Sequence, residues 1–436
     1  MTRRLTIHQW DGLDEPQRSL LLQRPAASQD ASVREDTEKI LSAVRKNGDA
    51  ALIELTQRFD KAIVSDFRVS EDEFSWALLQ LTADQISAID LAIANVRTFH
   101  EQQVPSTLTV ETMPGVVCER ISQAIDSVGL YVPAGTAPLP SAAIMLAVPA
   151  VIANCPEVIL CTPPRPDGKA DPAVLVAASR AGVSKIYKVG GAQAIAAMAY
   201  GTSSIPKVNK IFGPGNAWVT AAKTIVSAVL GGAAIDMPAG PSEVLVIGDA
   251  KASAEFVAAD LLSQAEHGAD SQVIFVTTDS GLANSVQDEV EMQLRGLSRA
   301  ETAKVALEHS RVIVVADRAS AIEISNRYAP EHLILQIENA RDAVPFIRNA
   351  GSVFIGRWTP EAVGDYCSGT NHVLPTYGYA STYSGLGVDQ FLRQMTLQEV
   401  SREGLEKLGA AVICLAGLEG LDGHAAAISR RLAQRI

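Results

Sequence analysis

From about residue 158 onward, short runs of β-branched and aliphatic residues alternate with longer alanine-rich stretches of helical spacing. Strands separated by helical segments of this length are typical of parallel sheets with crossover helices. The pattern therefore predicts an α/β fold. It predicts strands at 158–162, 186–189, 208–212, 244–247, 273–277, 311–316 and 333–337, and helices at 173–181, 192–200, 217–230 and 252–266.

The spacing of these elements fits two doubly wound, Rossmann-like domains with parallel sheets and a seam near 240–242. The first hundred residues are mostly helical and charged, and the last fifty read as short helices separated by glycine-rich turns. We expect four parts. They are a small N-terminal helical arm (1–30), a first Rossmann-like domain (31–130 with 242–386), a second one (131–241) and a small C-terminal helical domain (387–436).

The segment 127–156 contains no charged residue, which raises the question of a membrane span. Glycines and prolines interrupt it, and its continuous apolar part, 142–153, is too short to cross about 30 Å of hydrocarbon. A Gly/Pro loop leading into a buried helix explains the segment better. The N-terminus has two arginines with no apolar segment behind them, so we expect no secretory signal and a cytoplasmic location.

The composition argues against nucleic acid as a partner. The 436 residues include 37 basic and 49 acidic ones, which gives a net charge of −12, and the basic residues are scattered rather than clustered. The number of cysteines is odd and none has C-x-x-C spacing, so neither a disulfide framework nor a thiolate zinc site is indicated. We expect reduced thiols at Cys118, Cys155, Cys161, Cys367 and Cys414.

Four of the seven histidines lie in distinctive contexts, and histidine is both a common metal ligand and the usual base at neutral pH. Gln264 and His267 are three residues apart near a predicted helix end, so their side chains point to the same side and could hold a divalent ion. A solvated helix face or a helix cap would give the same spacing. The other three are His332, His372 and His424.

Glu331 and His332 follow Pro330 and directly precede a predicted strand, which places an acid and a base together at a helix-to-strand junction. Such a pair can remove the proton of an alcohol and then activate water. A surface turn that is merely polar is the alternative interpretation.

The segment 364–372 contains a carboxylate, three hydroxyls, an amide and an imidazole, and has little apolar content. Loops rich in directional polar groups are typical of binding sites. Asp365 could join Gln264, His267 and one more histidine in a nitrogen and oxygen ligand set suited to zinc. His424 is a candidate for the last position, although no local spacing requires it.

Neither standard nucleotide-binding fingerprint, G-x-G-x-x-G or the P-loop, occurs in the chain. Two predicted strand-turn-helix junctions, at 188–193 and 212–216, have small residues that would let a phosphate approach a helix N-terminus. Both could equally be tight turns, with Asn216 acting only as a helix cap.

Taken together, six segments resemble the histidinol dehydrogenase family in their order and separations, from about residue 30 to the C-terminus. The segments are VGGAQAIAA (189–197), FGPGN (212–216), DMPAGPSE (236–243), QAEH (264–267), YAPEHL (328–333) and GDYCSGTNHVLP (364–375). Six matches of this kind are far more specific than any one of them.

The resemblance implies a cytoplasmic, NAD-dependent oxidoreductase of histidine biosynthesis that converts L-histidinol to L-histidine in a four-electron oxidation through L-histidinal. It implies that Glu331 and His332 are the catalytic pair, with His332 as the base and Glu331 activating water. It also implies one Zn²⁺ per subunit, bound by Gln264, His267, Asp365 and His424. The last ligand would come across a homodimer interface formed by 387–436.

The same resemblance implies further contacts with the substrate and with NAD. The substrate would contact the metal ligands and His332, together with Ser242, His372 and Glu419. NAD would contact Tyr131, Gln193 and Asn216. The loop 131–139 departs from the family pattern at Ala134 and Leu139, where glycine and tyrosine are usual, so we expect an altered cofactor loop.

Three other functions are compatible with parts of this pattern. A paralogous zinc and NAD dehydrogenase could oxidise another small alcohol, such as a sulfonated diol, but His372, Glu419 and His424 favour histidinol. A metal-dependent hydrolase could use Glu331 as its base, but would leave the two glycine-rich turns without a role. A non-catalytic binding protein predicts damage at one or more site positions, and none is seen.

Overall fold

The computed structural model describes residues 5–25, 31–134, 137–237 and 240–434. Within these ranges the strands form two parallel sheets and one antiparallel sheet, which confirms the predicted α/β fold. All seven strands expected from the sequence are present, with bounds that differ by a few residues at most.

The first parallel sheet has six strands in the order β1-β11-β10-β9-β12-β13. Alternate residues of β9 face opposite cores, because Val244 and Val246 pack beneath α10 to α12 while Leu245 and Ile247 pack beneath α1 and α13. The sheet is therefore doubly wound. The bounds are β1 Thr6–Gln9, β9 Glu243–Gly248, β10 Gln272–Thr277, β11 Arg311–Val314, β12 His332–Gln336, β13 Ser352–Ile355, α1 Glu15–Leu21, α10 Ala254–Ala265, α11 Ser280–Leu294, α12 Ala300–Glu308 and α13 Arg318–Tyr328.

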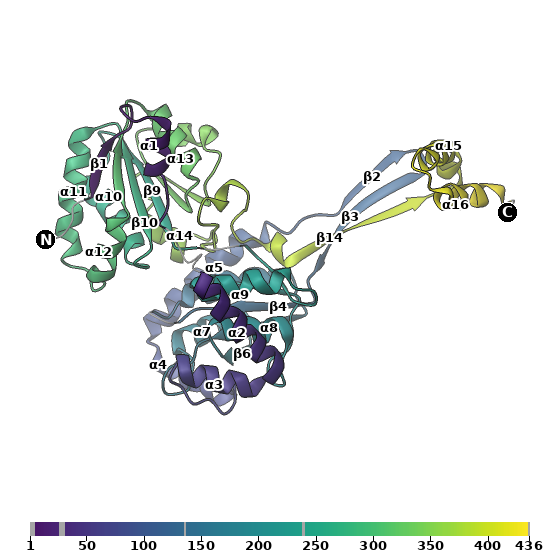
Figure 1. The fold of residues 1–436 in the computed structure, drawn as a ribbon, viewed down its shortest axis with the longest axis horizontal. Helices are drawn as coiled ribbons and strands as arrows, with labels where there is room; N and C mark the ends of the chain where they lie inside the picture. Colours follow the sequence, from purple (N-terminus) through teal and green to yellow (C-terminus); the bar gives the residue numbers. More distant parts are fainter. Residues whose placement is uncertain (1–4, 26–30, 135–136, 238–239, 435–436) are drawn as a thin grey trace.

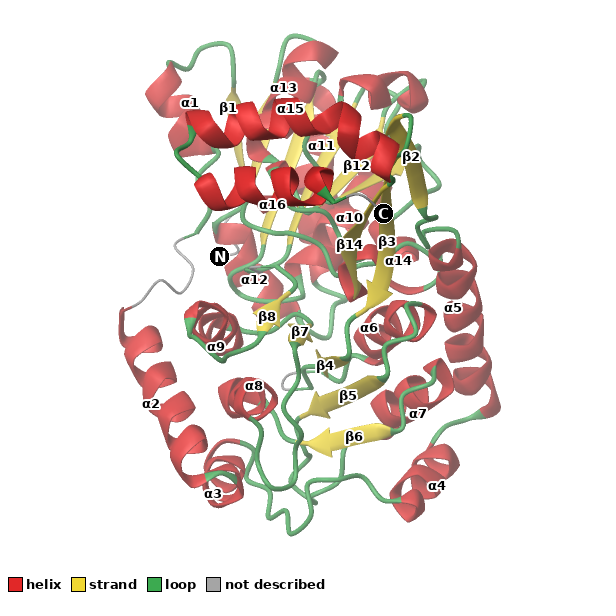
Figure 2. Cartoon of the chain, turned by 90° about the vertical axis from the view of Figure 1, so that its right-hand side faces the viewer, coloured by secondary structure: helices red, strands yellow, loops and turns green. Residues whose placement is uncertain are grey.

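The second parallel sheet has five strands in the order β6-β5-β4-β7-β8. Helices α5, α6 and α7 cover one face and α2, α3, α8 and α9 the other (Figure 2). The bounds are β4 Ser127–Tyr131, β5 Glu157–Thr162, β6 Lys185–Lys188, β7 Lys210–Phe212, β8 Ala234–Ile235, α2 Ala31–Asn47, α3 Asp49–Phe59, α4 Glu71–Gln80, α5 Ala83–Glu101, α6 Pro140–Ile152, α7 Pro172–Ala181, α8 Gly191–Tyr200 and α9 Ala217–Ala228.

The structure groups the N-terminal segments differently from the expectation. Helices α2 to α5, within 31–130, cover the second sheet instead of joining 242–386 on the first. Their apolar side chains, such as Leu52 and Val96, are buried against that second sheet, and periodicity shows an apolar face without showing which sheet covers it. The segment 1–30 is not only helical, because β1 pairs with β11 as an edge strand of the first sheet.

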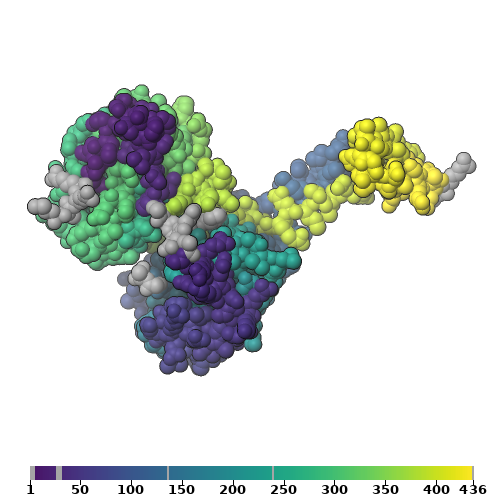
Figure 3. All heavy atoms as spheres, viewed as in Figure 1, coloured from purple at the N-terminus to yellow at the C-terminus, as the bar shows by residue number. Residues whose placement is uncertain are grey.

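A third part projects from the two parallel-sheet units as a long arm (Figures 1 and 3). Its stem is an antiparallel sheet of β2 (Leu108–Met113), β3 (Val116–Ala124) and β14 (Leu392–Val400), and its tip is the pair α15 (Arg402–Leu418) and α16 (Asp422–Ala433). The expected C-terminal unit of short helices thus contains a nine-residue strand and a 17-residue helix. Strand β14 pairs with β3, far away in sequence, so local pattern could not reveal it.

No single helix of the described ranges is long and apolar enough to span a membrane. Only α4 and α5 pass such a test together, and a bend of 110° separates them.

Candidate active site

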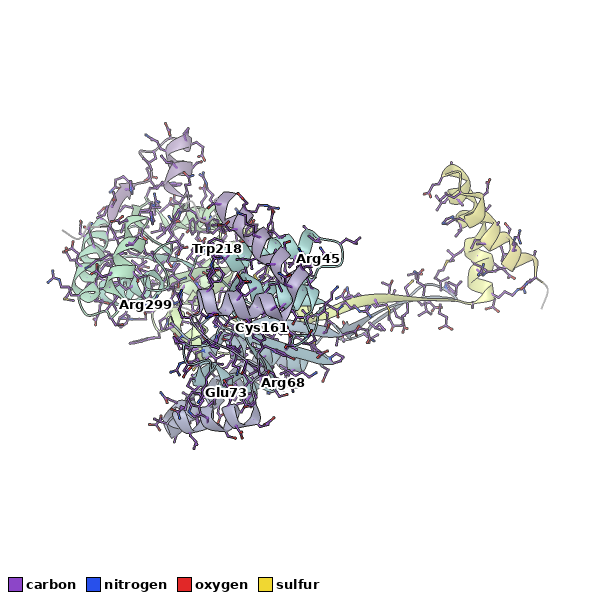
Figure 4. All side chains as sticks on the ribbon, turned by 60° about the horizontal axis from the view of Figure 1, so that its bottom comes forward. Arg45, Arg68, Glu73, Cys161, Trp218 and Arg299 are labelled. Atoms are coloured by element: carbon purple, nitrogen blue, oxygen red, sulfur yellow. The ribbon has the colours of Figure 1, made fainter. Side chains whose placement is uncertain are left out.

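A cavity of about 670 Å³ is lined by residues of both parallel-sheet units. Arg299, just before α12, lines it from the first unit and Trp218, in α9, from the second; Figure 4 labels both. On the side of the first sheet, the cavity is lined at the amino ends of β9 and β12. His267, just after α10, and Asp365 also line it on this side. From the second sheet it receives the carboxyl ends of β4, β6 and β7, where parallel sheets commonly bind nucleotides.

Glu331 and His332, at the start of β12, are almost completely buried. A single residue of the neighbouring strand contacts both of them. The backbone N–H of Glu243 donates to Oε2 of Glu331 at 2.9 Å, and its carbonyl oxygen lies 3.0 Å from Nδ1 of His332. A carbonyl can only accept, so Nδ1 carries the proton and Nε2 is left with a free lone pair.

Nε2 of His332 is buried and has no hydrogen-bond partner among the described residues. The nearest charged atom is Oδ1 of Asp365, at 3.7 Å. Burial lowers the pKa of His332 to about 4, and it raises the pKa of Glu331 well above its ordinary value. The imidazole is therefore neutral at pH 7 and able to accept a proton.

Of the four expected metal ligands, the structure brings His267 and Asp365 together, with ligand atoms within 4.8 Å of one another, and places Gln264 next to His332, which lies beside Asp365. Gln264 lies in the last turn of α10, His267 just beyond it, and Asp365 in the short helix α14 (Glu361–Tyr366). The amide oxygen of Gln264 is buried without a hydrogen-bond partner among the described residues, whereas its amide nitrogen faces Glu331 and His332 at 3.4 Å. A buried amide oxygen without a partner, in the same site as the imidazole of His267 and the carboxylate of Asp365, fits the donor set of a divalent cation.

Glu361 is a buried acid that the sequence analysis did not single out. One of its carboxylate oxygens lies within 4.8 Å of ligand atoms of both His267 and Asp365, and neither oxygen has a hydrogen-bond partner among the described residues. Burial raises its pKa well above the ordinary value, and the charges of Asp365 and Glu331 add to the effect. Its position four residues before Asp365, one helical turn away, was the available signal.

His424 and Glu419 do not join this group within one chain. Both are exposed at the tip of the arm, and neither lines the cavity. Figure 1 shows α15 and α16 at the far end of that arm. The other expected substrate residues, Ser242 and His372, do line the cavity, and Oγ of Ser242 lies 3.4 Å from Nδ1 of His267.

The three expected cofactor residues line the other end of the cavity. The hydroxyl oxygen of Tyr131 accepts a hydrogen bond from the backbone of Gly191 at 3.0 Å. Gln193 is buried in α8, and Asn216 caps α9 by accepting from Val219. The departures Ala134 and Leu139 flank this end and Leu139 lines the cavity, but 135–136 lie outside the described residues.

A buried ion pair shapes the glycine-rich turn after β7, and the sequence analysis missed it. Lys223 lies 2.5 Å from Asp236 and donates to the carbonyl of Gly213 at 2.7 Å, while Asp236 accepts from the N–H of Gly213. Gly213 has φ +121°, and a Cβ there would lie 2.1 Å from the carbonyl oxygen of Tyr131. Only glycine lets the turn approach Tyr131 this closely.

Comparisons with known proteins cover almost the whole chain. A family model described as histidinol dehydrogenase matches residues 22–432. Over 423 residues the chain is 51% identical to histidinol dehydrogenase of Vibrio vulnificus strain CMCP6, covering 97% of both chains. It is 53% identical over 423 residues to that of Xanthomonas campestris pv. campestris strain 8004, covering 97% of this chain and 98% of the relative.

The crystal structure of histidinol dehydrogenase from Elizabethkingia anophelis superposes with a TM-score of 0.95 at 45% identity, covering 99% of both chains. The agreement therefore extends from the sequence to the arrangement of all three parts. The chain belongs to the histidinol dehydrogenase family.

Proposed function

We propose that this protein oxidises L-histidinol to L-histidine through L-histidinal, with two molecules of NAD⁺ as electron acceptors, in the last steps of histidine biosynthesis. One juxtaposition carries the proposal. The buried Glu331–His332 pair lies with His267 and Asp365 at one end of a cavity whose other end is formed by glycine-rich turns of the second sheet, and the buried Gln264 lies next to His332. A base, a metal-donor set and a dinucleotide surface are what an alcohol dehydrogenase of this family requires.

In the first oxidation, Nε2 of His332 takes the hydroxyl proton while a hydride leaves the adjacent carbon for NAD⁺. This yields the aldehyde and NADH. Glu331 then takes a proton from water as the water adds to the aldehyde, whose oxygen takes the proton that His332 holds. The resulting hydrate gives a hydroxyl proton back to His332 and a second hydride to a second NAD⁺, and the carboxylic acid so formed loses its remaining acidic proton to become the carboxylate. Burial supports both roles, because it keeps His332 neutral and makes the ionised form of Glu331 a stronger base.

Gln264, His267 and Asp365 would hold zinc, which would supply a Lewis acid that orients the substrate. Ser242 and His372 would line the pocket around the substrate, and Tyr131, Gln193 and Asn216 would contact NAD. The enclosed cavity would also keep the reactive amino-aldehyde from solvent between the two oxidations.

The fourth ligand, His424, and the substrate contact Glu419 would come from a second copy of the chain. Every residue of β14 after its first is exposed in the isolated chain, and α16 has no buried residue among those described. A three-stranded stem with two terminal helices buries too little to be retained without a partner surface. A homodimer would cover this arm and complete the site, and we propose that assembly.

The test is the stoichiometry of turnover. Zinc-loaded protein with L-histidinol and excess NAD⁺ should form two NADH for each histidine, and His332→Ala should abolish both products. Absence of NADH in a folded, metal-replete preparation would contradict the proposal. Turnover of a sulfonated diol instead would identify a paralogue, and substrate cleavage without NAD⁺ would identify a hydrolase.

A further inference from the structure

Behind the catalytic pair, an ion pair connects the segment after α1 with the first residue of β9. Arg24 contacts both carboxylate oxygens of Glu243, with Nε at 2.6 Å from one and a terminal nitrogen at 2.8 Å from the other. The side chains are 16% and 2% exposed, so the bidentate pair is largely shielded from water. The two residues are 219 positions apart in sequence.

Further contacts fix both partners of this pair. The guanidinium of Arg24 lies over the ring of Tyr328, 3.9 Å from its centroid, and donates to the carbonyl of Tyr328 at 2.6 Å. The backbone N–H of Tyr377 donates to Oε1 of Glu243 at 2.7 Å, and its hydroxyl donates to the carbonyl of Pro25 at 2.5 Å. The carboxylate of Glu243 is therefore held from two directions.

The backbone of Glu243 is the group that contacts both Glu331 and His332. In a strand, the side chain stands roughly perpendicular to the sheet, while the N–H and C=O lie in the sheet and point to the neighbouring strand. Fixing the side chain of the first residue of β9 therefore also fixes the direction of its peptide groups. Those groups determine the protonated nitrogen of His332 and the orientation of Glu331.

We propose that the Arg24–Glu243 ion pair is a positioning device that aligns the catalytic Glu331 and His332 through the backbone of residue 243, so that the segment after α1 supports catalysis. The inference rests on the proposed function. A buried ion pair loses hydration energy and adds little net stability, whereas its bidentate geometry restricts orientation. Arg24 and Glu243 are positioning residues, since neither lines the cavity.

The test compares Arg24→Gln, Arg24→Lys and Glu243→Gln with a matched control, Glu73→Gln. Glu73 forms a similarly buried ion pair with Lys188 at 2.9 Å, but it joins α4 to the second sheet and lies outside the cavity lining. A misplacement of about 1 Å at a catalytic group costs up to ~100-fold in rate. We expect Arg24→Gln and Glu243→Gln to lower kcat about tenfold, with KM for NAD⁺ unchanged.

Arg24→Lys should recover part of the loss, because lysine keeps the charge but not the fork of donors. Glu73→Gln should lower Tm without lowering kcat. The inference is wrong if Arg24→Gln leaves kcat unchanged. It is also wrong if Glu73→Gln lowers kcat as much as Arg24→Gln does for the same loss of Tm, because the ion pair would then act through stability alone.

A second readout needs no substrate. In ¹⁵N-histidine-labelled protein, the His332 signals, assigned with His332→Gln, should show the Nδ1-protonated tautomer, and Arg24→Gln should give a mixture of tautomers. An unchanged tautomer in Arg24→Gln would overturn the inference. If Arg24→Gln gives a mixture of tautomers while the wild-type protein makes no NADH from histidinol, the proposed function fails and the positioning of His332 by the ion pair still holds.

Discussion

The peptide groups of Glu243 assign complementary tasks to two adjacent side chains. The carbonyl oxygen beside Nδ1 of His332 leaves Nε2 free to accept a proton, and the N–H at Oε2 of Glu331 leaves the other carboxylate oxygen free for the water that the proposed mechanism requires. The two residues should therefore be separable by experiment, because in the proposed mechanism the alcohol step uses the imidazole and the hydration step uses the carboxylate.

Glu331→Gln should slow oxidation of L-histidinal far more than oxidation of L-histidinol. Glutamine keeps an oxygen to accept from the N–H of Glu243, but it cannot take a proton from water, and a general base contributes about 100- to 10,000-fold. Stopped-flow NADH formation from each substrate measures this. In the comparison variant, His332→Gln, oxidation of L-histidinol should be slowed more than oxidation of L-histidinal. If Glu331→Gln slows both oxidations equally, the division of roles is wrong.

His267→Asn should release the metal without unfolding the protein. The imidazole is one of the proposed metal donors and lies close to Asp365 and Glu361. Loss of a residue that only supports a metal ligand already costs about 10- to 100-fold in metal affinity. Zinc content after dialysis against a competing chelator gives the result directly. His309→Asn, at an exposed histidine outside the cavity, is the matched control, and retention of zinc by His267→Asn would remove this residue from the ligand set.

Between elements, a buried carboxyl group connects α10 to the first sheet, and burial makes its ionisation unfavourable. Asp260, in α10, accepts a hydrogen bond from Gln336 at the end of β12 at 2.8 Å. Burial raises the pKa of Asp260 to about 6. The folded protein then holds a proton that the unfolded chain releases near pH 4, so stability falls as pH rises from about 4 to about 6.

Asp260→Asn should accordingly raise the Tm of the metal-free protein, and the gain should increase with pH. Asparagine can keep the acceptor for Gln336 and has no charge to bury. We expect the Tm difference from wild type to grow by roughly 1–2 °C between pH 5 and pH 8, which corresponds to about 1 kcal/mol for a chain of this length. Calorimetry at both pH values measures it, and a difference independent of pH would contradict the buried, raised-pKa carboxyl.

Within each element, local pattern was a good guide. The strands β5, β6, β7, β9, β10, β11 and β12 match the predicted ones because a buried parallel strand is a short aliphatic run bounded by turn residues. The other strands, β1 to β4, β8, β13 and β14, were not predicted. β4 lies in the uncharged segment whose glycines and prolines obscured it, and β8 has only two residues.

For the molecule as a whole, the arm is the part that carries expected site residues away from the cavity of its own chain. It carries His424 and Glu419, both exposed, while the other expected site residues except the buried Gln264 line a cavity in the two parallel-sheet units. If a second copy supplies the arm, each site combines the cavity of one chain with the arm of the other.

Mixed dimers of His332→Ala and His424→Ala should then recover activity. In such a dimer one site carries both changes and the other carries neither, so an equal mixture after subunit exchange should reach about a quarter of wild-type activity. Each variant alone should be almost inactive. NADH formation before and after exchange is the measurement. No recovery, with exchange verified by mass, would mean that His332 and His424 act within one chain or that His424 has no role.

The residue pattern alone was enough to predict the α/β class and seven of the strands, because strand periodicity is a local property, whereas the site side chains were named through the resemblance of six segments to the histidinol dehydrogenase family. Three features became visible only in the folded chain: α2 to α5 cover the second sheet, Glu361 lies beside His267 and Asp365, and Arg24 contacts Glu243. These contacts join segments far apart along the chain, and their partners are chosen by packing and burial, which no local pattern records.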